Sequence, residues 1–456
     1  MFKKIILCAL LASLTVSLVQ ADDIADGLKA YNKGDKKQAY MLWKKAADAG
    51  NSVGIYNLGL MYANGDGVKQ DFKKAVEYYQ KAIEKGSIDA ILNLGLMYER
   101  GNGVAKNMQK ALELYKESAA KGSSLAMKNI ALSYRFGDGV EKNEAEAFKW
   151  FKQSAEHGNA DAQNSLAQMY RNAISVAQDY AKAIEWYKKS SKNGSSVAKY
   201  NLGQMYEFGY GVPKDILSAF GYYSEAANAG YASAQLKIAQ MFEKGMGVKK
   251  DVQESKKWYL KASENGSIDA IVQTGSLFFT GDNGFEKNYT EAIRYFKFAA
   301  NRGNAIAQKN LGLAYRYGMG VKQDLNEALH WYEKSADNGN AGAMRSAGRI
   351  YKHAKRYKDA VEWLTKAARR GDMYAQSDLG FLYENAKGVK RDYKKALKFY
   401  TKAAKKGEVV AQYYLAVMYY NGKGVKKDRK KAKKWMTACA RQGDADAKKF
   451  LKKYKF

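Results

Sequence analysis

Cysteine, proline and histidine are scarce in this chain of 456 residues, which contains two, one and three of them. Cys8 lies in an N-terminal run that we expect to be removed, so Cys439 has no partner for an internal disulfide. The fold must therefore be stabilised by packing rather than by covalent cross-links. The histidines, His157, His330 and His353, have no second histidine at metal-ligand spacing, so we expect no metal and no other cofactor.

Long apolar runs are also absent, except at the start of the chain. There, two lysines precede an apolar run at residues 5–19, and a small-residue cleavage signature ends at Ala21. We predict a signal peptide at residues 1–21 and an exported mature chain from Asp22 that is periplasmic or secreted. Because Cys8 lies inside the signal, a lipid-anchored cysteine is not expected. The mature chain is predicted to have no transmembrane segment.

Acidic residues are few, with 46 Asp and Glu against 77 Lys and Arg and a formal net charge of +31. This charge favours an acidic partner, such as an anionic lipid surface, an acidic envelope polymer or an acidic protein. Nucleic acid would also match the charge, but the export signal argues against a nucleic-acid partner. Since 46% of the residues are hydrophobic and 13% are aromatic, the chain is not expected to be disordered.

Glycine, in contrast, recurs at a fixed spacing along the whole chain. The intervals are 36 residues, with one of 37 and one of 32, between glycines 50, 86, 122, 158, 194, 230, 266, 303, 339, 371, 407 and 443. Such a period predicts a single elongated solenoid in which each repeating unit contacts mainly its neighbours.

Residues 87–122 illustrate the content of one unit. Apolar residues recur every three or four positions from Ala90 to Tyr98 and from Ala111 to Ala119, which predicts two amphipathic helices forming a hairpin. The first helix carries a small residue, followed three positions later by an aromatic one, which indicates close approach between packed helix backbones. The small residues are Gly59, Gly95, Ala131, Ala167, Gly203, Ala239, Gly275, Gly312, Gly348, Gly380 and Ala416.

Gly-x-Gly pairs such as Gly101 and Gly103 raise the possibility of a phosphate-binding loop. They follow a helix, however, whereas dinucleotide-binding loops follow a strand. We interpret the first glycine as a left-handed helix stop. An Asp or Asn then caps the second helix. The predicted caps are Asp35, Asp71, Asn107, Asn143, Asp179, Asp215, Asp251, Asn288, Asp324, Asp392 and Asp428.

Two units depart from this pattern. Residues 171–178 lack both glycines, and the unit that ends at Gly371 is four residues short, with residues 352–356 in place of the usual loop.

The second helices carry aromatic residues at two adjacent positions of the repeat, such as Trp186 and Tyr187. These rings either pack in the core, with one of each pair partly exposed, or stack on sugars of a cell-wall polymer.

The chain resembles the Sel1-like repeat family, which is related to the tetratricopeptide repeats. The family pattern is matched in one unit by Ala90, Leu94, Gly95, Tyr98, Gly101, Gly103, Val104, Asn107, Lys110, Ala111, Tyr115 and Gly122. The resemblance covers a half repeat at 22–50 and eleven repeats at 51–443, and a basic capping helix at 444–456 follows. It implies an all-α fold, a curved α-solenoid of helix-turn-helix repeats, whose inner face binds partners that are usually proteins.

Some cysteine-rich members of this family are classed as β-lactamases. This chain lacks paired cysteines, and its two Ser-x-x-Lys tetrads, Ser118 to Lys121 and Ser196 to Lys199, have no accompanying Ser-Asp-Asn or Lys-Thr-Gly motif. The Ser118 position is occupied in other units by Ala or Ser, and once by Cys439, so it accommodates a small packed residue. We therefore do not predict an enzyme.

Two groups of candidate site residues remain. Residues 352–456 hold 30 Lys and Arg and 10 Asp and Glu, so this end either contacts an acidic partner or forms a solvated cap. Its candidate contacts are Lys426, Lys427, Arg429, Lys430, Lys431, Lys433, Lys434, Lys448, Lys449, Lys452 and Lys453. An Asn two residues before the small position either faces the binding groove or braces the neighbouring unit's turn. These residues are Asn57, Asn93, Asn129, Asn201 and Asn310.

The predicted function is that of an exported, non-catalytic scaffold that mediates protein–protein interactions in the cell envelope or with a host. The alternative is a protein that binds peptidoglycan or another envelope glycan, favoured by the aromatic rings and lysines. A β-lactamase-like hydrolase is a lesser alternative, favoured only by family association.

Overall fold

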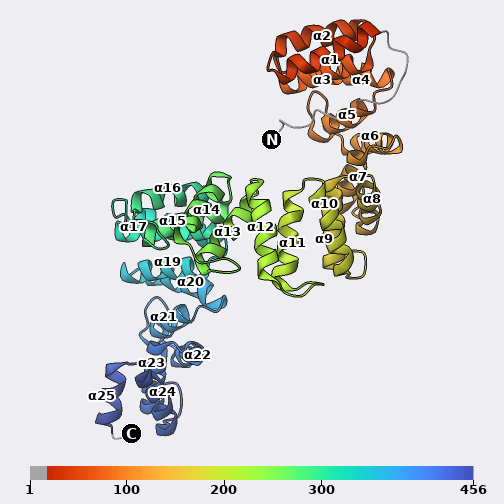
Figure 1. Ribbon diagram of the computed structural model, residues 1–456. Helices are drawn as coiled ribbons and strands as arrows, with labels where there is room; N and C mark the ends of the chain where they lie inside the picture. Colours follow the sequence, from red (N-terminus) through yellow and green to blue (C-terminus); the bar gives the residue numbers. More distant parts are fainter. Residues whose placement is uncertain (1–17, 455–456) are drawn as a thin grey trace. The chain divides into compact units, whose positions relative to one another are not determined.

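The computed structural model describes residues 18–454, which form 25 α-helices and no β-strand (Figure 1). This architecture confirms the predicted all-α solenoid. Most of the predicted signal peptide at 1–21, including Cys8, lies outside the described residues. Within them, no helix has the length and hydrophobicity needed to span a bilayer.

The helices group into two compact units, one ending at Ala229 and the other starting at Gly230. The first unit contains α1 (Leu18–Asn32), α2 (Lys36–Asp48), α3 (Ser52–Asn64), α4 (Phe72–Glu84), α5 (Ile88–Arg100), α6 (Met108–Ala120), α7 (Ser124–Phe136), α8 (Glu144–Glu156), α9 (Ala160–Asn172), α10 (Tyr180–Lys192), α11 (Ser196–Phe208) and α12 (Ile216–Asn228). Within this compact unit, each helix packs mainly on its neighbours in the sequence.

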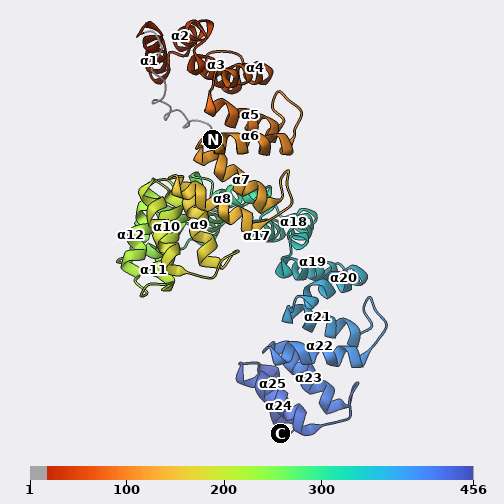
Figure 2. The same cartoon turned by 90° about the vertical axis from the view of Figure 1, so that its right-hand side faces the viewer.

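The second unit has the same arrangement, and Figure 2 shows its hairpins following one another from α19 to α24. Its helices are α13 (Ala232–Lys244), α14 (Val252–Glu264), α15 (Ile268–Thr280), α16 (Tyr289–Ala300), α17 (Ala305–Tyr317), α18 (Leu325–Asp337), α19 (Ala341–His353), α20 (Tyr357–Arg369), α21 (Met373–Glu384), α22 (Tyr393–Lys405), α23 (Val409–Asn421), α24 (Arg429–Arg441) and α25 (Ala445–Lys453). From α3 to α24, we call the odd-numbered helices first helices and the even-numbered ones second helices.

The predicted helix ends are confirmed. Gly101 ends α5 in the left-handed conformation, with φ of 73°, and the corresponding glycines do the same. The Oδ1 atom of Asn107 accepts a hydrogen bond of 2.9 Å from the amide of Lys110 at the start of α6. Every other Asp or Asn predicted as a cap also accepts a backbone amide.

The second glycine of each pair has a role that sequence reasoning missed. A Cβ atom on Gly103 would lie 2.4 Å from the carbonyl oxygen of Phe72, the first residue of the preceding second helix. Gly139, Gly211, Gly320, Gly388 and Gly424 approach the preceding second helix in the same way. These turns therefore rest on the unit before them, and a Cβ atom at these glycines would collide with the preceding second helix.

The glycines at the small position of the first helices pack mainly against a ring of the second helix, except Gly348, which packs against Leu364. The close approach predicted from the sequence is therefore mostly that of a helix backbone to a side chain. A Cβ atom on Gly95 would lie 2.6 Å from Cε1 of Tyr115, on the second helix of the same hairpin. The rings of this register are fully buried, whereas the neighbouring tryptophans are half-buried, as expected for two adjacent positions. The buried tyrosines are Tyr79, Tyr115, Tyr187, Tyr223, Tyr259, Tyr332 and Tyr400.

The unit without glycines keeps the regular path of its turn. Ala173 and Ser175 adopt positive φ angles of 55° and 57° at the positions where glycine normally stands. The closing bond from the amide of Asp179 to the carbonyl of Tyr170 is 3.0 Å long. Alanine and serine thus adopt here a left-handed conformation that L-residues disfavour.

Candidate functional site

Four positions of each first helix lie on one side of it, and most of their side chains are exposed or partly exposed, although Asn201 and Asp378 are buried. Counted from the small packing residue, these positions are −6, −2, +1 and +5, which lie within roughly 60° of one another around a helix of 100° per residue. In α11 these residues are Val197, Asn201, Gln204 and Phe208, and in α17 they are Ile306, Asn310, Leu313 and Tyr317. We call these positions the first-helix stripe.

Large apolar side chains are exposed at both ends of the stripe. Phe136, Phe208 and Tyr317 occupy its last position and are 65%, 53% and 54% exposed. Ile306 and Val410 occupy its first position and are about as exposed. Because exposed apolar groups that recur on one face indicate an interaction surface, the stripe is the candidate binding surface of the chain.

The five candidate asparagines all lie at position −2 of the stripe. Nδ2 of Asn93 donates a hydrogen bond of 2.8 Å to the hydroxyl of Tyr56, and Nδ2 of Asn201 donates one of 2.8 Å to Oδ1 of Asn164. Both acceptors belong to the preceding first helix. These two amides thus connect neighbouring first helices, whereas within residues 18–454 no such hydrogen bond is found for Asn57, Asn129 or Asn310.

Asp378 occupies the same position and was missed by sequence reasoning. Its side chain is only 10% exposed and pairs with Nε of Arg349 at 2.7 Å and with Nζ of Lys352. Both cations lie on the preceding first helix. The sequence feature that could have identified it is an acidic residue at the repeat position where asparagine recurs.

A second missed feature is a set of carboxylates on the first helices that accept hydrogen bonds from core tyrosines. The hydroxyl of Tyr115 donates to Glu99 at 2.5 Å, and that of Tyr223 donates to Glu207 at 2.6 Å. Tyr259 and Tyr400 donate in the same way to Glu243 and Glu384. Burial, and then the adjacent carboxylate, raise the pKa of Tyr115 and of its equivalents well above the ordinary value.

These raised pKa values predict alkaline destabilisation. Above about pH 10 the unfolded tyrosines lose their protons while the buried ones keep theirs, so the folded state binds more protons and stability falls as pH rises. The limiting loss is about 1.4 kcal/mol per pH unit for each such tyrosine. Urea unfolding at pH 9 to 11 should show a smaller loss when Tyr115, Tyr223, Tyr259 and Tyr400 are changed to Phe. Equal losses in the two proteins would contradict this account.

The basic candidates lie on the turn before α24, on α24 and on α25. All eleven side chains are exposed. Lys431 pairs with Asp428 at 3.3 Å and Lys449 with Asp446 at 3.8 Å, in each case within a few residues of the same segment. Arg429 donates a hydrogen bond of 3.0 Å to the carbonyl of Tyr454. Exposed pairs of this kind stabilise the fold little, so these cations are accessible to an acidic surface.

Four tryptophans of the second helices are each covered by the lysine three residues later: Trp186, Trp258, Trp331 and Trp363. Nζ of Lys189 lies 4.1 Å from the ring centroid of Trp186, and Nζ of Lys366 lies 4.3 Å from that of Trp363. Trp186 also packs against the core. A sugar could stack on such a ring only after displacing the ammonium group.

The side chains considered as possible catalytic groups are instead buried, paired in a salt bridge or located at a helix end. The hydroxyl of Ser118 is buried, and Lys199 of the other tetrad pairs with Glu225 at 2.9 Å. Cys439 is buried, and burial raises the pKa of its thiol to about 11, so it is mostly protonated near neutral pH. His157 caps α8 with its ring nitrogen 2.9 Å from the carbonyl of Gln153. Within residues 18–454, no group of three or more potential metal-ligating side chains comes together.

Comparisons with known proteins agree with this geometry. The family model described as Sel1 repeat matches residues 26–51, 52–87, 88–123, 124–159, 160–195, 196–231, 232–267, 268–304, 305–340, 352–372, 374–408 and 409–444. A protective antigen of uropathogenic Escherichia coli strains that displays an SLR fold is 32% identical, with a TM-score of 0.67; the alignment covers 91% of this chain and 90% of that chain. A Sel1 repeat protein from Oxalobacter formigenes is 28% identical, with a TM-score of 0.50, covering 54% and 96%. No curated protein matches the chain.

Proposed function

Because this chain belongs to the Sel1 repeat family, whose repeats mediate protein interactions, we propose that it is an exported, non-catalytic scaffold that holds a protein partner along its first-helix stripe. The observation that carries this proposal is the exposure of large apolar side chains, such as Phe208 and Tyr317, at equivalent stripe positions. Aromatic side chains are enriched in the cores of protein interfaces.

The separation between constant packing positions and variable stripe positions within each repeat supports a scaffold function. Packing positions such as Gly95 and Tyr115 recur from unit to unit, so the frame is constant. Stripe positions vary among apolar, amide and charged residues, so each unit can contribute a different contact. A periodic frame with variable exposed residues suits recognition of an extended partner.

Export rests on the predicted signal peptide at residues 1–21, and we propose a periplasmic or secreted location. The E. coli relative is a protective antigen, which is in keeping with export. We further propose that the basic end, through residues such as Lys430 and Lys434, orients the protein on an acidic surface.

Site-specific photo-crosslinking tests the scaffold proposal. A photoreactive phenylalanine analogue at Phe208 is expected to capture the same discrete protein from an envelope extract at low and high salt. The matched control places the analogue at Lys188, which is exposed on α10, a second helix of the same compact unit. The captured protein, purified, should bind the intact chain and bind a Phe208→Ser variant more weakly.

Equal capture at both positions, or unchanged binding by the variant, would remove the stripe as the binding surface. Capture that disappears at high salt would instead assign the contact to the basic end, because screening weakens interactions between exposed charges. Glycan binding remains the alternative. Cosedimentation with cell-wall sacculi, without capture of any protein, would favour it.

A further inference from the structure

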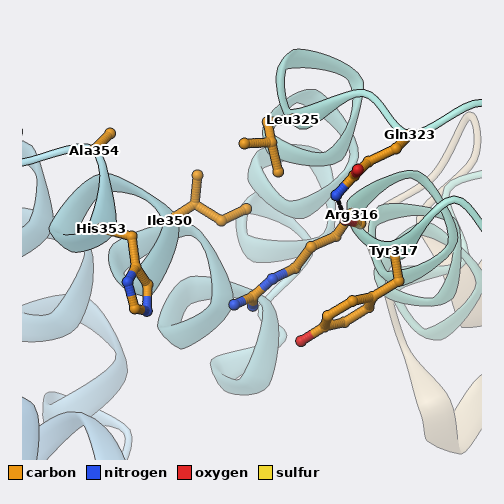
Figure 3. Close-up of a pocket in the computed structure, with 7 residues that line it drawn as sticks. All are labelled: Arg316, Tyr317, Gln323, Leu325, Ile350, His353 and Ala354. Atoms are coloured by element: carbon orange, nitrogen blue, oxygen red, sulfur yellow. Dashed lines mark hydrogen bonds between the residues drawn. The ribbon is translucent and has the colours of Figure 1, made fainter.

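The shortest turn between a first and a second helix lies next to a pocket. Residues 354–356 connect α19 to α20, whereas residues 318–324 connect α17 to α18. The pocket has a volume of about 450 Å³, and Arg316, Leu325 and His353 are among the residues that line it (Figure 3). Pockets of this size accommodate small ligands and side chains.

The pocket lies where a turn is four residues shorter than in a regular unit. In regular units the second glycine of a turn covers the first residue of the preceding second helix, as Gly320 covers Tyr289 and Gly388 covers Tyr357. Leu325 is the corresponding first residue of α18, but the next turn is too short to cover it. Leu325 is therefore 49% exposed, whereas Tyr289 and Tyr357 are partly buried.

The cation at this site is Arg316, which differs from the arginines of α19 in its ion pairing. Arg345 pairs with Asp372, and Arg349 with Asp378, whereas Arg316 has no carboxylate partner among residues 18–454. Arg316 lies beside the hydroxyl of the buried Tyr332. Figure 3 shows its guanidinium reaching between Tyr317 and the side of the pocket formed by Ile350 and His353.

The apolar part of the pocket lies beside this cation. Leu325 and the nearly buried Ile350 form apolar walls, while the ring of Tyr317 flanks the guanidinium, with its centroid 5.1 Å from Cζ of Arg316. A guanidinium binds a carboxylate through two parallel hydrogen bonds. An inorganic anion would use the guanidinium but leave the apolar walls exposed to water.

We propose that this pocket binds an acidic segment of a protein partner that inserts one apolar side chain between Leu325 and Ile350 and places a carboxylate on Arg316. The inference rests on the proposed scaffold function and names the chemistry of the partner at one site. The segment takes the place of the four turn residues that this repeat lacks. His353, at the end of α19, is within the same pocket and supplies a second polar contact.

Fluorescence anisotropy on the full mature chain tests this proposal. The probe is a fluorescein-labelled six-residue peptide amide with one leucine between two glutamates. We expect it to bind, and expect Arg316→Gln to weaken binding at least tenfold, because the carboxylate then loses its charged partner. Peptides with glutamines in place of the glutamates, or with serine in place of the leucine, should bind equally weakly.

Two further variants serve as controls. Lys322→Gln removes a charge from an exposed residue of the α17–α18 turn outside the pocket, and should leave binding unchanged. Replacing residues 354–356 with the seven-residue sequence of 318–324 restores a regular turn over Leu325 and should abolish binding. Helical content and thermal unfolding establish that each variant is folded.

The proposal is overturned if the acidic peptide does not bind, or if Arg316→Gln and the restored turn leave its affinity unchanged. Neither result affects capture at Phe208, which lies in the other compact unit. Conversely, peptide binding without any partner captured at Phe208 would remove the stripe proposal and leave the pocket as an isolated site.

Discussion

Replacing Tyr115 with alanine is expected to lower the free energy of unfolding by about 3 to 5 kcal/mol, the range for removing a large buried ring. The ring is fully buried, contacts the backbone of α5 at Gly95, and donates its hydroxyl hydrogen bond to Glu99. The variant therefore leaves a cavity inside one hairpin. Urea unfolding followed by circular dichroism measures the loss.

Tyr115→Phe is the matched control, because it keeps the ring and removes only the hydroxyl. A loss of about 1 to 3 kcal/mol is expected for a hydrogen bond to a charged group. Gly95→Ala should also destabilise the protein, since its Cβ atom would meet the ring, but much less so in a Tyr115→Ala background. Additive effects of Gly95→Ala and Tyr115→Ala would contradict the close contact between them.

Replacing Gly103 with alanine is expected to destabilise the protein by roughly 2 to 5 kcal/mol, from two separate costs. The residue has a φ of 73°, and an L-residue in that conformation costs about 1 to 2 kcal/mol. The new Cβ atom would also collide with the backbone of Phe72, and overpacking of this kind costs about 1 to 3 kcal/mol. Urea unfolding, with hydrogen exchange in α4 and α6, measures and localises the effect.

Gly122→Ala separates the two costs. Gly122 also has a positive φ, of 92°, but a Cβ atom there would have no neighbour within 4 Å. Only the conformational cost should appear, about 1 to 2 kcal/mol. If the Gly103 and Gly122 variants lost the same stability, the contact between a turn and the preceding unit would be energetically unimportant.

Much of the fold could be predicted from the sequence because its determinants are local and repeated. A helix stop such as Gly101 and a cap such as Asn107 act within a few residues, so their spacing alone predicts the hairpin. The 36-residue period then predicts the solenoid, since each hairpin can bury its apolar face only against its neighbours. Helical periodicity also predicted that one ring of each adjacent pair packs in the core, but only the structure showed that it is the Tyr115 register.

The candidate site was less predictable, because its chemistry depends on which side chains meet between units. The sequence placed Asn93 and Asn201 in one column but did not show that their amides bond to residues 37 positions earlier. The pairing of Asp378 with Arg349 and Lys352 also joins neighbouring repeats. Such contacts require the relative rotation of two packed helices, which periodicity does not specify.

The sequence by itself determined the hairpin, its ends, its period and the excess of basic residues at the C-terminal end, since all of these follow from residue type and spacing. Only the tertiary structure decided which face of each first helix reaches solvent and why the second glycine is required. It also showed that a pocket lies beside the turn that is four residues short. The physical reason is that a turn such as that of Gly103 rests on the preceding repeat, so where the turn is shortened, the residue it would cover, Leu325, is exposed.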